Sequence, residues 1–233
     1  MNIKAEDLSI VYKKKARSIK VLEAVSFAPA AGEVTVITGR SGSGKTTLIN
    51  IMAGLLAPTE GRVYYDDMPV YQTDDERLSA FRNLNIGYIP QCSSALSGLD
   101  TLQNILLPSV LAGIDKTEEA EKLISAMRLE GLKNACPDEL SGGELRRLAA
   151  ARALINSPSV IFADEPTNDL DDENAALILG MLKAQAQNGA AVIIVTHDSA
   201  ALAYADRVYT MDGGKLVTKE NEHEDTLCRC YVS

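Results

Sequence analysis

The sequence predicts an α/β fold with an N-terminal antiparallel β-subdomain and an inserted α-helical subdomain. Residues 160–163 and 191–196 are short, continuous apolar runs, typical of strands covered on both faces of a parallel sheet. A glycine-rich turn at residues 39–46 stands between a strand pattern and a helix pattern. Strand patterns are missing between about residues 99 and 154, where helix patterns dominate. We therefore expect an α/β core that is interrupted by helices.

The first part of the chain contains most of the predicted strands. Apolar residues alternate or cluster in short segments there, and Gly or Pro residues separate the segments. In order, the patterns predict strands at 3–11, 21–27 and 33–38, a helix at 47–54, a strand at 62–65, a polar helix at 74–82 and a strand at 86–90.

The middle of the chain is predicted to be helical. Residues 101–111 form one expected helix, in which Pro108 would cause a kink. Asp115 and Glu118 have the spacing of a capping box and are expected to open a helix that runs toward Leu129. A further helix is expected from Ser141 to about residue 155.

The core resumes after these helices. Ala175, Ile178, Leu179 and Leu182 have the spacing of an amphipathic helix that connects the strands at 160–163 and 191–196. Asp212-Gly213-Gly214 predicts a hairpin turn. We expect one domain over residues 1–233, with residues 1–93 and 157–233 as the α/β core with its β-subdomain, and about 94–156 as the helical subdomain.

Charge and hydropathy exclude several classes of protein. With 23 Lys and Arg against 32 Asp and Glu, the net charge is −9, and we expect no nucleic acid partner. No apolar run approaches the roughly 18 residues of a membrane span. The charged N-terminus does not resemble a signal peptide. We therefore expect a cytoplasmic chain whose membrane role, if it has one, depends on a partner.

The four cysteines do not form the pattern of a disulfide framework. Cys92, Cys136, Cys228 and Cys230 are too few and too scattered, so reduced thiols are expected. Cys228 and Cys230 could chelate a metal with His223, but a frayed C-terminal tail is the simpler interpretation.

A nucleotide site is predicted at residues 39–46, Gly-Arg-Ser-Gly-Ser-Gly-Lys-Thr, which match the G-x-x-x-x-G-K-[ST] motif. Glycines allow successive backbone N–H groups to surround anionic phosphates, and the N-terminus of the following helix attracts them. Lys45 would contact the β- and γ-phosphates, and the Thr46 hydroxyl would bind Mg²⁺. The motif therefore predicts a P-loop NTPase core that binds a nucleotide with Mg²⁺.

Asp164 and Glu165 are predicted to complete this site. Asp164 ends a buried strand, where a carboxylate is costly unless it binds a partner such as Mg²⁺. Glu165 follows directly and would polarise the attacking water.

A second anion site is predicted at Leu140-Ser141-Gly142-Gly143-Glu144. Ser141 and Glu144 have capping-box spacing, and the glycines would expose backbone donors at the start of a helix. Because Lys45 already belongs to the first phosphate site, the second one would serve a neighbouring molecule.

Taken together, these motifs resemble those of the ABC-type ATPases, and the resemblance covers nearly the whole chain. Residues 140–144 resemble the signature motif, residues 168–171 the D-loop, and residues 195–198 the switch-histidine motif. The resemblance implies that two subunits sandwich two ATP molecules, each between one P-loop and the opposite signature motif.

The resemblance implies a role for each matching residue. Gln91 would bridge Mg²⁺ and the water to the helical subdomain, and His197 would hold the γ-phosphate and position Glu165. The catalytic set is Glu165, His197, Lys45 and Gln91, and the metal ligands are Thr46, Gln91 and Asp164. The nucleotide-binding set is Tyr12, which would stack on adenine, with Gly39, Arg40, Ser41, Gly42, Ser43, Gly44, Lys45, Thr46, Thr47, Ser141, Gly142, Gly143 and Asp171.

Simpler interpretations remain for single positions. Tyr12 could be a strand-edge tyrosine, Gln91 an ordinary loop residue and His197 a structural histidine. The sequence also departs from common family patterns. Glu144 stands where many members have glutamine, Leu145-Arg146-Arg147 replaces a glutamine-rich stretch, and Arg40 replaces a frequent proline. We expect these changes to alter contacts without abolishing hydrolysis.

Residues 104–113 and 165–171 most resemble the macrolide-export, lipoprotein-release and peptide-export branch. This implies separately encoded membrane permease subunits, an ATPase dimer and a location on the cytoplasmic face of the membrane. Apolar residues between 96 and 111 could receive a segment of the membrane subunit, or could be core packing. The alternatives are a non-transport ATPase acting on ribosomes or DNA, and a membrane-linked regulatory ATPase. The transported substrate is not encoded in these motifs.

Overall fold

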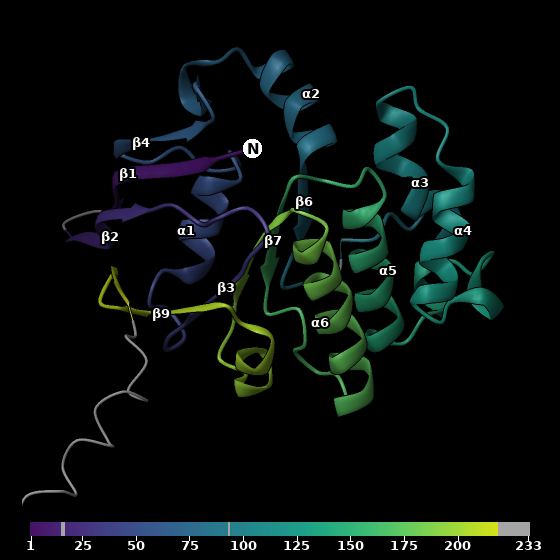
Figure 1. Ribbon diagram of the computed structural model, residues 1–233. Helices are drawn as coiled ribbons and strands as arrows, with labels where there is room; N and C mark the ends of the chain where they lie inside the picture. The colour runs from purple at the N-terminus through teal and green to yellow at the C-terminus, as the bar shows by residue number, and fades with distance from the viewer. Residues whose placement is uncertain (15–16, 93, 219–233) are drawn as a thin grey trace, which may run out of the picture.

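The computed structural model describes residues 1–14, 17–92 and 94–218 (Figure 1). Its centre is a six-stranded sheet in the order β10-β9-β3-β8-β7-β6. Strands β9 to β6 are parallel to their neighbours, and β10 is antiparallel to β9. The strands are β3 (Val34–Thr38), β6 (Ile86–Ile89), β7 (Val160–Asp164), β8 (Ala191–Val195), β9 (Arg207–Asp212) and β10 (Lys215–Thr218).

The two faces of this sheet belong to two different apolar cores. In β8, Val192 and Ile194 pack with the helices, whereas Ile193 and Val195 pack with the N-terminal strands. Successive side chains of a strand point to opposite faces, so a continuous apolar run serves both cores. This explains why the strands at β7 and β8 lack an alternating pattern.

A second, antiparallel sheet lies in the order β2-β1-β4-β5. It consists of β1 (Ile3–Lys14), β2 (Arg17–Phe27), β4 (Glu60–Tyr65) and β5 (Met68–Pro69). Helix α1 (Lys45–Met52) shares one apolar core with this sheet and with one face of the central sheet. The expected antiparallel N-terminal strands are therefore present, and two of them are longer than expected.

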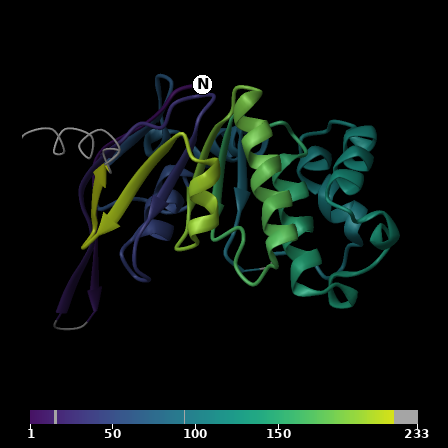
Figure 2. The same cartoon turned by 60° about the horizontal axis from the view of Figure 1, so that its bottom comes forward.

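Helices cover the other face of the central sheet. Figures 1 and 2 show α5 and α6 beside the sheet, with α3 and α4 farther out. These helices are α3 (Thr101–Leu111), α4 (Thr117–Ala126), α5 (Gly142–Leu154) and α6 (Asp172–Gln187). Helix α2 (Asp75–Asn85) instead packs its Leu78 and Phe81 in the core that contains α1. The part of the chain that the structure describes also contains four 3₁₀ turns: η1 (Val70–Gln72), η2 (Glu130–Leu132), η3 (Pro137–Glu139) and η4 (Ser199–Tyr204).

The start and the end of α4 both differ from the predicted positions. The capping box expected at Asp115 and Glu118 is wrong, because Lys116 is the N-cap of α4. The Asp115 carboxylate instead accepts hydrogen bonds from the backbone N–H and hydroxyl of Thr117, at 3.0 and 2.7 Å. Bonding two residues ahead is a local turn that competes with a helix cap. Helix α4 ends at Ala126, before the expected Leu129.

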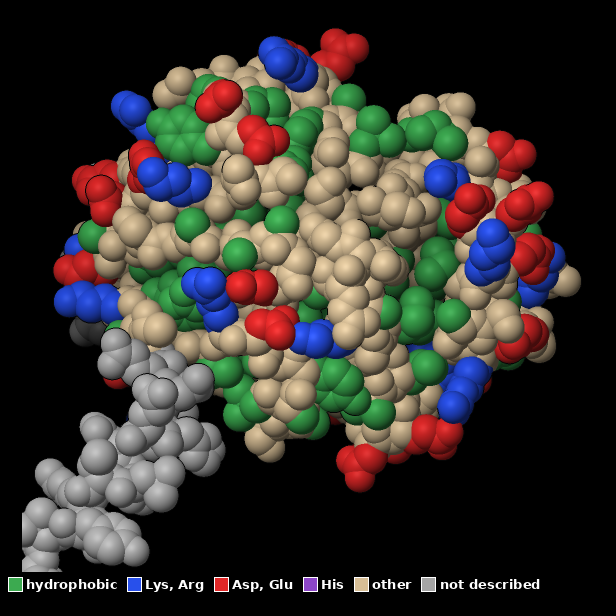
Figure 3. Space-filling view, in the orientation of Figure 1, with side chains coloured by type: hydrophobic (Ala, Val, Ile, Leu, Met, Phe, Trp, Pro, Cys, Tyr) green, Lys and Arg blue, Asp and Glu red, His purple; other side chains and the backbone are tan. Residues whose placement is uncertain are grey.

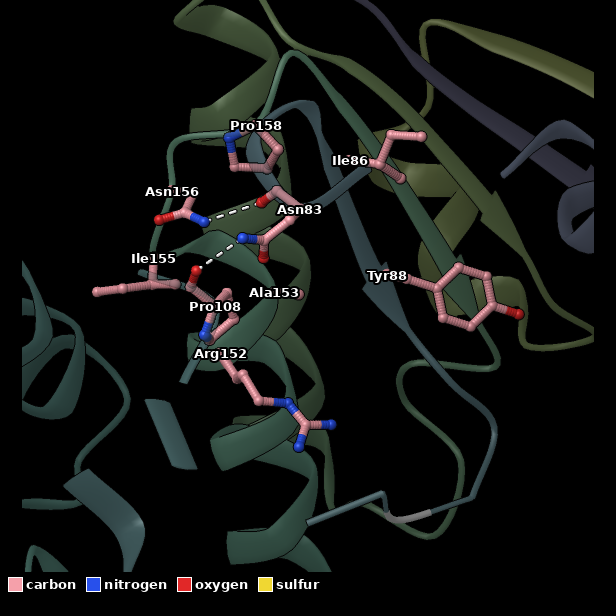
Figure 4. Close-up of a pocket in the computed structure, with 9 residues that line it drawn as sticks. All are labelled: Asn83, Ile86, Tyr88, Pro108, Arg152, Ala153, Ile155, Asn156 and Pro158. Carbon is pink, nitrogen blue, oxygen red and sulfur yellow. Dashed lines mark hydrogen bonds between the residues drawn. The ribbon is translucent and has the colours of Figure 1, made fainter. Parts of the chain in front are cut away.

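A small cavity of about 120 Å³ lies where α2, α3 and the segment after α5 meet. Pro108 lies inside α3, and its carbonyl accepts a hydrogen bond from the Asn83 side chain of α2 at 2.9 Å (Figure 4). The Asn156 amide in turn donates to the Asn83 carbonyl at 2.8 Å. These two bonds connect α2, α3 and the segment after α5.

The remaining expectations concern cysteines and the membrane. Cys92 and Cys136 are free thiols. His223, Cys228 and Cys230, the candidate metal ligands near the C-terminus, lie outside the described residues. Within residues 1–14, 17–92 and 94–218, no helix combines the length and apolar character needed to cross a membrane.

Candidate functional site

The loop between β3 and α1 encloses a lysine. The Lys45 ammonium donates to the carbonyls of Gly39 and Arg40 at 2.7 and 3.2 Å, and the side chain is almost completely buried. A Cβ on Gly39 would lie 2.3 Å from the Met211 carbonyl, and Gly44 caps α1 with φ +109°. Only glycine fits both positions without strain. The loop can therefore place its N–H groups and Lys45 around a phosphate.

Asp164 is a buried carboxylate with a free oxygen. It ends β7 with 2% of its surface exposed, and its Oδ1 has no hydrogen-bond partner among the described residues. Burial raises the pKa of Asp164, against the opposing influence of the Thr46 hydroxyl and the Lys45 ammonium. An unpaired carboxylate oxygen near a hydroxyl offers the hard oxygen ligands that Mg²⁺ prefers. Asp164 and Thr46 thus fit a magnesium ion.

Glu165 is held by the strand next to it. Its Oε2 accepts from the Thr196 hydroxyl at 2.7 Å and from the His197 backbone N–H at 3.2 Å, and its Oε1 lies 3.0 Å from His197 Nδ1. Burial alone would raise the pKa of Glu165, but the hydrogen bonds from His197 and Thr196 bring that pKa below its usual value. Glu165 is therefore an ionised carboxylate in a fixed orientation.

Lys45, Glu165 and His197 line a cavity of about 510 Å³, a size typical of ligand sites, whereas Asp164 is not among its lining residues. They meet there because β3, β6, β7 and β8 are parallel, so the loops at their carboxyl ends share one edge of the sheet. Lining residues are Val21, Ser41, Gly42, Gly44, Lys45, Thr46, Thr47, Gln91, Glu165 and His197.

Several predicted site residues lie away from this cavity. Tyr12 is 45% exposed on β1, pairs with Ile19 and does not line the cavity, whereas Val21 of β2 does. Gly39, Arg40 and Ser43 belong to the same loop but are not among the lining residues. The residues Ser141, Gly142, Gly143 and Asp171 are also absent from the lining.

The start of α5 forms the expected capping box. The Ser141 hydroxyl accepts from the Glu144 N–H at 3.3 Å, and the Glu144 carboxylate accepts from the Ser141 N–H and hydroxyl at 2.7 Å each. These bonds lower the pKa of Glu144. Ser141 and Gly142 are exposed, and no atom lies within 4 Å of a Cβ built on Gly142. This helix end is therefore accessible to another molecule.

Asp171 is the N-cap of α6 and is connected to α5. Its carboxylate accepts from the backbone N–H and side-chain amide of Asn174 at 2.8 and 2.7 Å. The Asn174 side-chain oxygen accepts from Arg147 of α5 at 2.5 Å. The loop that precedes α6 is thus joined to the helix that begins at the signature-like motif.

Sequence reasoning missed two contacts that orient the site. Thr196 received no role, although its buried hydroxyl donates to Glu165. The Thr167 hydroxyl donates to Asp198 at 2.7 Å and connects the loops after β7 and β8. Both threonines lie inside or beside the motifs that were recognised, but a motif match does not reveal which way a hydroxyl points.

The family is decided by a comparison with protein-family models. The model described as ABC transporter matches residues 22–168. The chain belongs to the ABC transporter family. Among its relatives, the lipoprotein-releasing system ATP-binding protein LolD of Chromohalobacter salexigens is 37% identical over 218 residues, which are 92% of each chain. The ATP-binding protein HrtA of Staphylococcus aureus, whose name refers to hemin import, is 36% identical over 93% of this chain and 99% of its own.

Solved structures confirm the fold class of this ABC ATPase. The ATP-binding cassette MJ0796, as a post-hydrolysis dimer with ADP and Pi, has a TM-score of 0.87 and 32% identity. A second dimeric MJ0796 structure has a TM-score of 0.85, also at 32% identity. Each alignment covers 94% of this chain and 97% of the other. The prediction of an ATP-hydrolysing ABC cassette is confirmed.

Proposed function

We propose that this ABC ATPase powers an exporter of the macrolide, lipoprotein or peptide type, and that two ATPase subunits close on ATP to drive separate membrane subunits. The observation that carries the proposal is the orientation of Glu165, whose carboxylate faces the P-loop cavity while Thr196 and His197 hold it. An ionised, oriented carboxylate beside a phosphate-binding loop can act as a general base toward water.

Each remaining group has a defined task in this proposal. Lys45 exchanges its bonds with the Gly39 and Arg40 carbonyls for the β- and γ-phosphates. Thr46, Asp164 and Gln91 hold Mg²⁺, which when bound neutralises charge on the phosphates. His197 keeps Glu165 in place. Its ring is exposed and is therefore accessible to the γ-phosphate, which it contacts in this proposal. Glu165 would accept a proton from water as the water oxygen bonds to the γ-phosphorus, while the bond between that phosphorus and the β,γ-bridging oxygen breaks and ADP leaves.

A second subunit completes the site. Ser141, Gly142 and Gly143 do not line the cavity of their own chain, yet the helix end that carries them is accessible. Backbone donors at a helix N-terminus bind anions. The proposal places this helix end against the γ-phosphate bound by the other subunit, and Asp171 near the same interface. The dimeric MJ0796 structures support the pairing of two subunits.

The proposed contact with the membrane subunit lies at the end of α3. Val110 and Leu111 are 65% and 72% exposed, and Ile114 in the following loop is 41% exposed. Figure 3 shows hydrophobic side chains at the surface over the upper end of α3. Leu102 and Leu106 are instead packed against the helical core. We propose that an apolar segment of the membrane subunit covers Val110, Leu111 and Ile114 on the cytoplasmic face of the membrane.

The proposed export direction follows from the resemblance of residues 104–113 and 165–171 to the export branch, because the names of the relatives do not agree on a direction. LolD is named for lipoprotein release, and it resembles this chain over 92% of its length. HrtA is named for hemin import and is about as similar. The specific cargo of this transporter is a property of its membrane subunits.

The decisive experiment replaces Glu165 with Gln. The E165Q variant keeps the shape of the side chain but removes the base, so we expect ATP binding to persist while kcat falls about 10²–10⁴-fold, the usual contribution of a general base. Size-exclusion chromatography with Mg·ATP is expected to show a dimer that wild type forms only transiently.

Each outcome has a clear meaning. Hydrolysis by E165Q at the wild-type rate would show that Glu165 is not the base. Lost hydrolysis with a strictly monomeric E165Q protein would contradict the two-subunit site. Co-purification of the chain with ribosomes or DNA, and not with a membrane protein, would contradict the transport role.

A further inference from the structure

The loop after β6, which carries Gln91, is attached to α5 by one side chain. Arg146 Nη1 donates to the Pro90 carbonyl, and Arg146 Nη2 donates to the Gln91 carbonyl, both at 2.7 Å. A guanidinium presents its donors in a rigid planar fork, so it can hold two adjacent carbonyls at once.

Arg146 also lies between the two loops that flank the nucleotide site. It lines a groove of about 350 Å³ together with Gln91, Gly142 and Asp169, which come from three different segments. Its positive charge lowers the pKa of Asp164, although burial is the larger influence and raises it. Arg146 thus contacts the loop that carries the proposed metal ligand Gln91, while its backbone belongs to the helix that follows Ser141.

The neighbouring arginines have different partners. Arg147 points to α6 and donates to Asn174. Arg152, two turns farther along α5, donates to the Ser94 carbonyl at 2.9 Å. Among these side chains of α5, Arg146 is the one that contacts Gln91 itself.

We propose that Arg146 is a positioning residue for Gln91, and that it makes the placement of the Gln91 side chain depend on the orientation of α5. The inference rests on the role proposed above for Gln91. When the signature end of α5 moves to meet a nucleotide on the other subunit, the two carbonyl bonds move Gln91 with it. Arg146 acts only through this loop and does not contact the nucleotide.

The first test compares steady-state ATPase kinetics of three variants. R146M keeps the length of the side chain without its donors, and we expect kcat to fall about tenfold, or about 1.4 kcal/mol, with an unchanged KM for ATP. R146K is expected to retain an intermediate kcat because one ammonium replaces the fork. R128M is the matched control, because it removes an exposed arginine whose partner, Glu173, is exposed as well.

The second test is a double-mutant cycle with Q91A. If Arg146 acts through Gln91, the kcat values of Q91A and Q91A/R146M will be the same. Amide hydrogen exchange of the peptide covering residues 88–92 is expected to become faster in R146M, but not in R128M. Melting curves of all variants check that they fold.

The outcomes separate this inference from the proposed function. A normal kcat in Q91A would contradict the role of Gln91 and the inference together. A lowered kcat in Q91A with a normal kcat in R146M would leave the role of Gln91 intact and overturn the inference. Additive effects in the double variant, or unchanged exchange in R146M, would also overturn it.

Discussion

Burial and hydrogen bonding change the pKa of Glu165 in opposite directions. Burial raises it, but the bonds from His197 and Thr196 prevail, and the pKa lies below its usual value. Because the folded-state pKa is lowered, the stabilisation from this carboxylate is present above the unfolded-state pKa and is lost as the pH falls through the folded-state pKa. The same bonds keep the carboxylate ionised and able to accept a proton at neutral pH.

Replacing Thr196 with Val tests how its hydrogen bond affects the pKa of Glu165. The substitution removes one hydrogen-bond donor, so the pKa of Glu165 rises and the acidic limb of the kcat–pH profile moves to higher pH. A net hydrogen-bond contribution of about 0.5–1.5 kcal/mol corresponds to a fall in kcat of about 2–10-fold. T196S keeps the hydroxyl and should behave like wild type, whereas an unchanged profile in T196V would contradict the role of Thr196.

Replacing Asp164 with Asn tests the metal site. The folded-state pKa of Asp164 is raised, so its ionised form costs stability at neutral pH, and this cost disappears as the pH falls below the unfolded-state pKa. We expect D164N to melt at a higher temperature than wild type without nucleotide. Saturating Mg·ATP, which at 100 times its Kd would stabilise wild type by about 2.7 kcal/mol, should stabilise D164N much less. Equal stabilisation of both proteins by Mg·ATP would contradict a metal role for Asp164.

The residues that motifs mark by type were the easiest to predict. The structure brings Lys45, Thr46, Gln91, Glu165 and His197 to one cavity, as the sequence suggested. The contacts of Thr196 and Arg146 were not predictable, because they depend on which carbonyl or carboxylate the fold places within reach. No sequence pattern specifies how far a given side chain lies from a carbonyl or carboxylate in another part of the chain.

Elements were predicted well where the hydrophobic pattern is long, and poorly at their ends. The central strands match because burial on both faces requires continuous apolar residues. The start of α4 was mistaken because Asp115 can cap a helix or close a turn, and the choice depends on local geometry. Short elements such as β5 and η4 were not expected, since a few residues carry no periodicity.

Two glycines, one in a strand and one in a helix, give a prediction about the stability of the fold. A Cβ on Gly87 in β6 would lie 2.6 Å from the Ala153 carbonyl, whereas a Cβ on Gly180 in α6 meets no atom within 4 Å. We expect G87A to destabilise the fold by about 1–3 kcal/mol, as overpacking does. G180A should stabilise it by about 0.5–1 kcal/mol, because alanine favours a helix. Urea unfolding measures both, and a stable G87A protein would contradict the close packing of β6 against α5.

For the whole molecule, the exposed end of α3 gives a prediction about assembly. L111D places a charge in the proposed contact, so the membrane subunit should no longer co-purify, while basal ATPase activity and ATP-dependent dimerisation stay unchanged. V217D is the control, because Val217 is also exposed but lies on β10. Equal capture of the membrane subunit by both variants would show that the contact lies elsewhere.

The position of β3 in the central sheet has a consequence for synthesis on the ribosome. β3 ends at Thr38, yet its two neighbours, β8 and β9, begin at Ala191 and Arg207. The Val34 N–H even bonds to the Asp206 carboxylate, 172 residues later. Such distant pairings form slowly. A nascent chain must therefore carry an unpaired, apolar β3 until residues 191–212 have been synthesised, and chaperones that bind extended apolar segments have their longest opportunity during that interval.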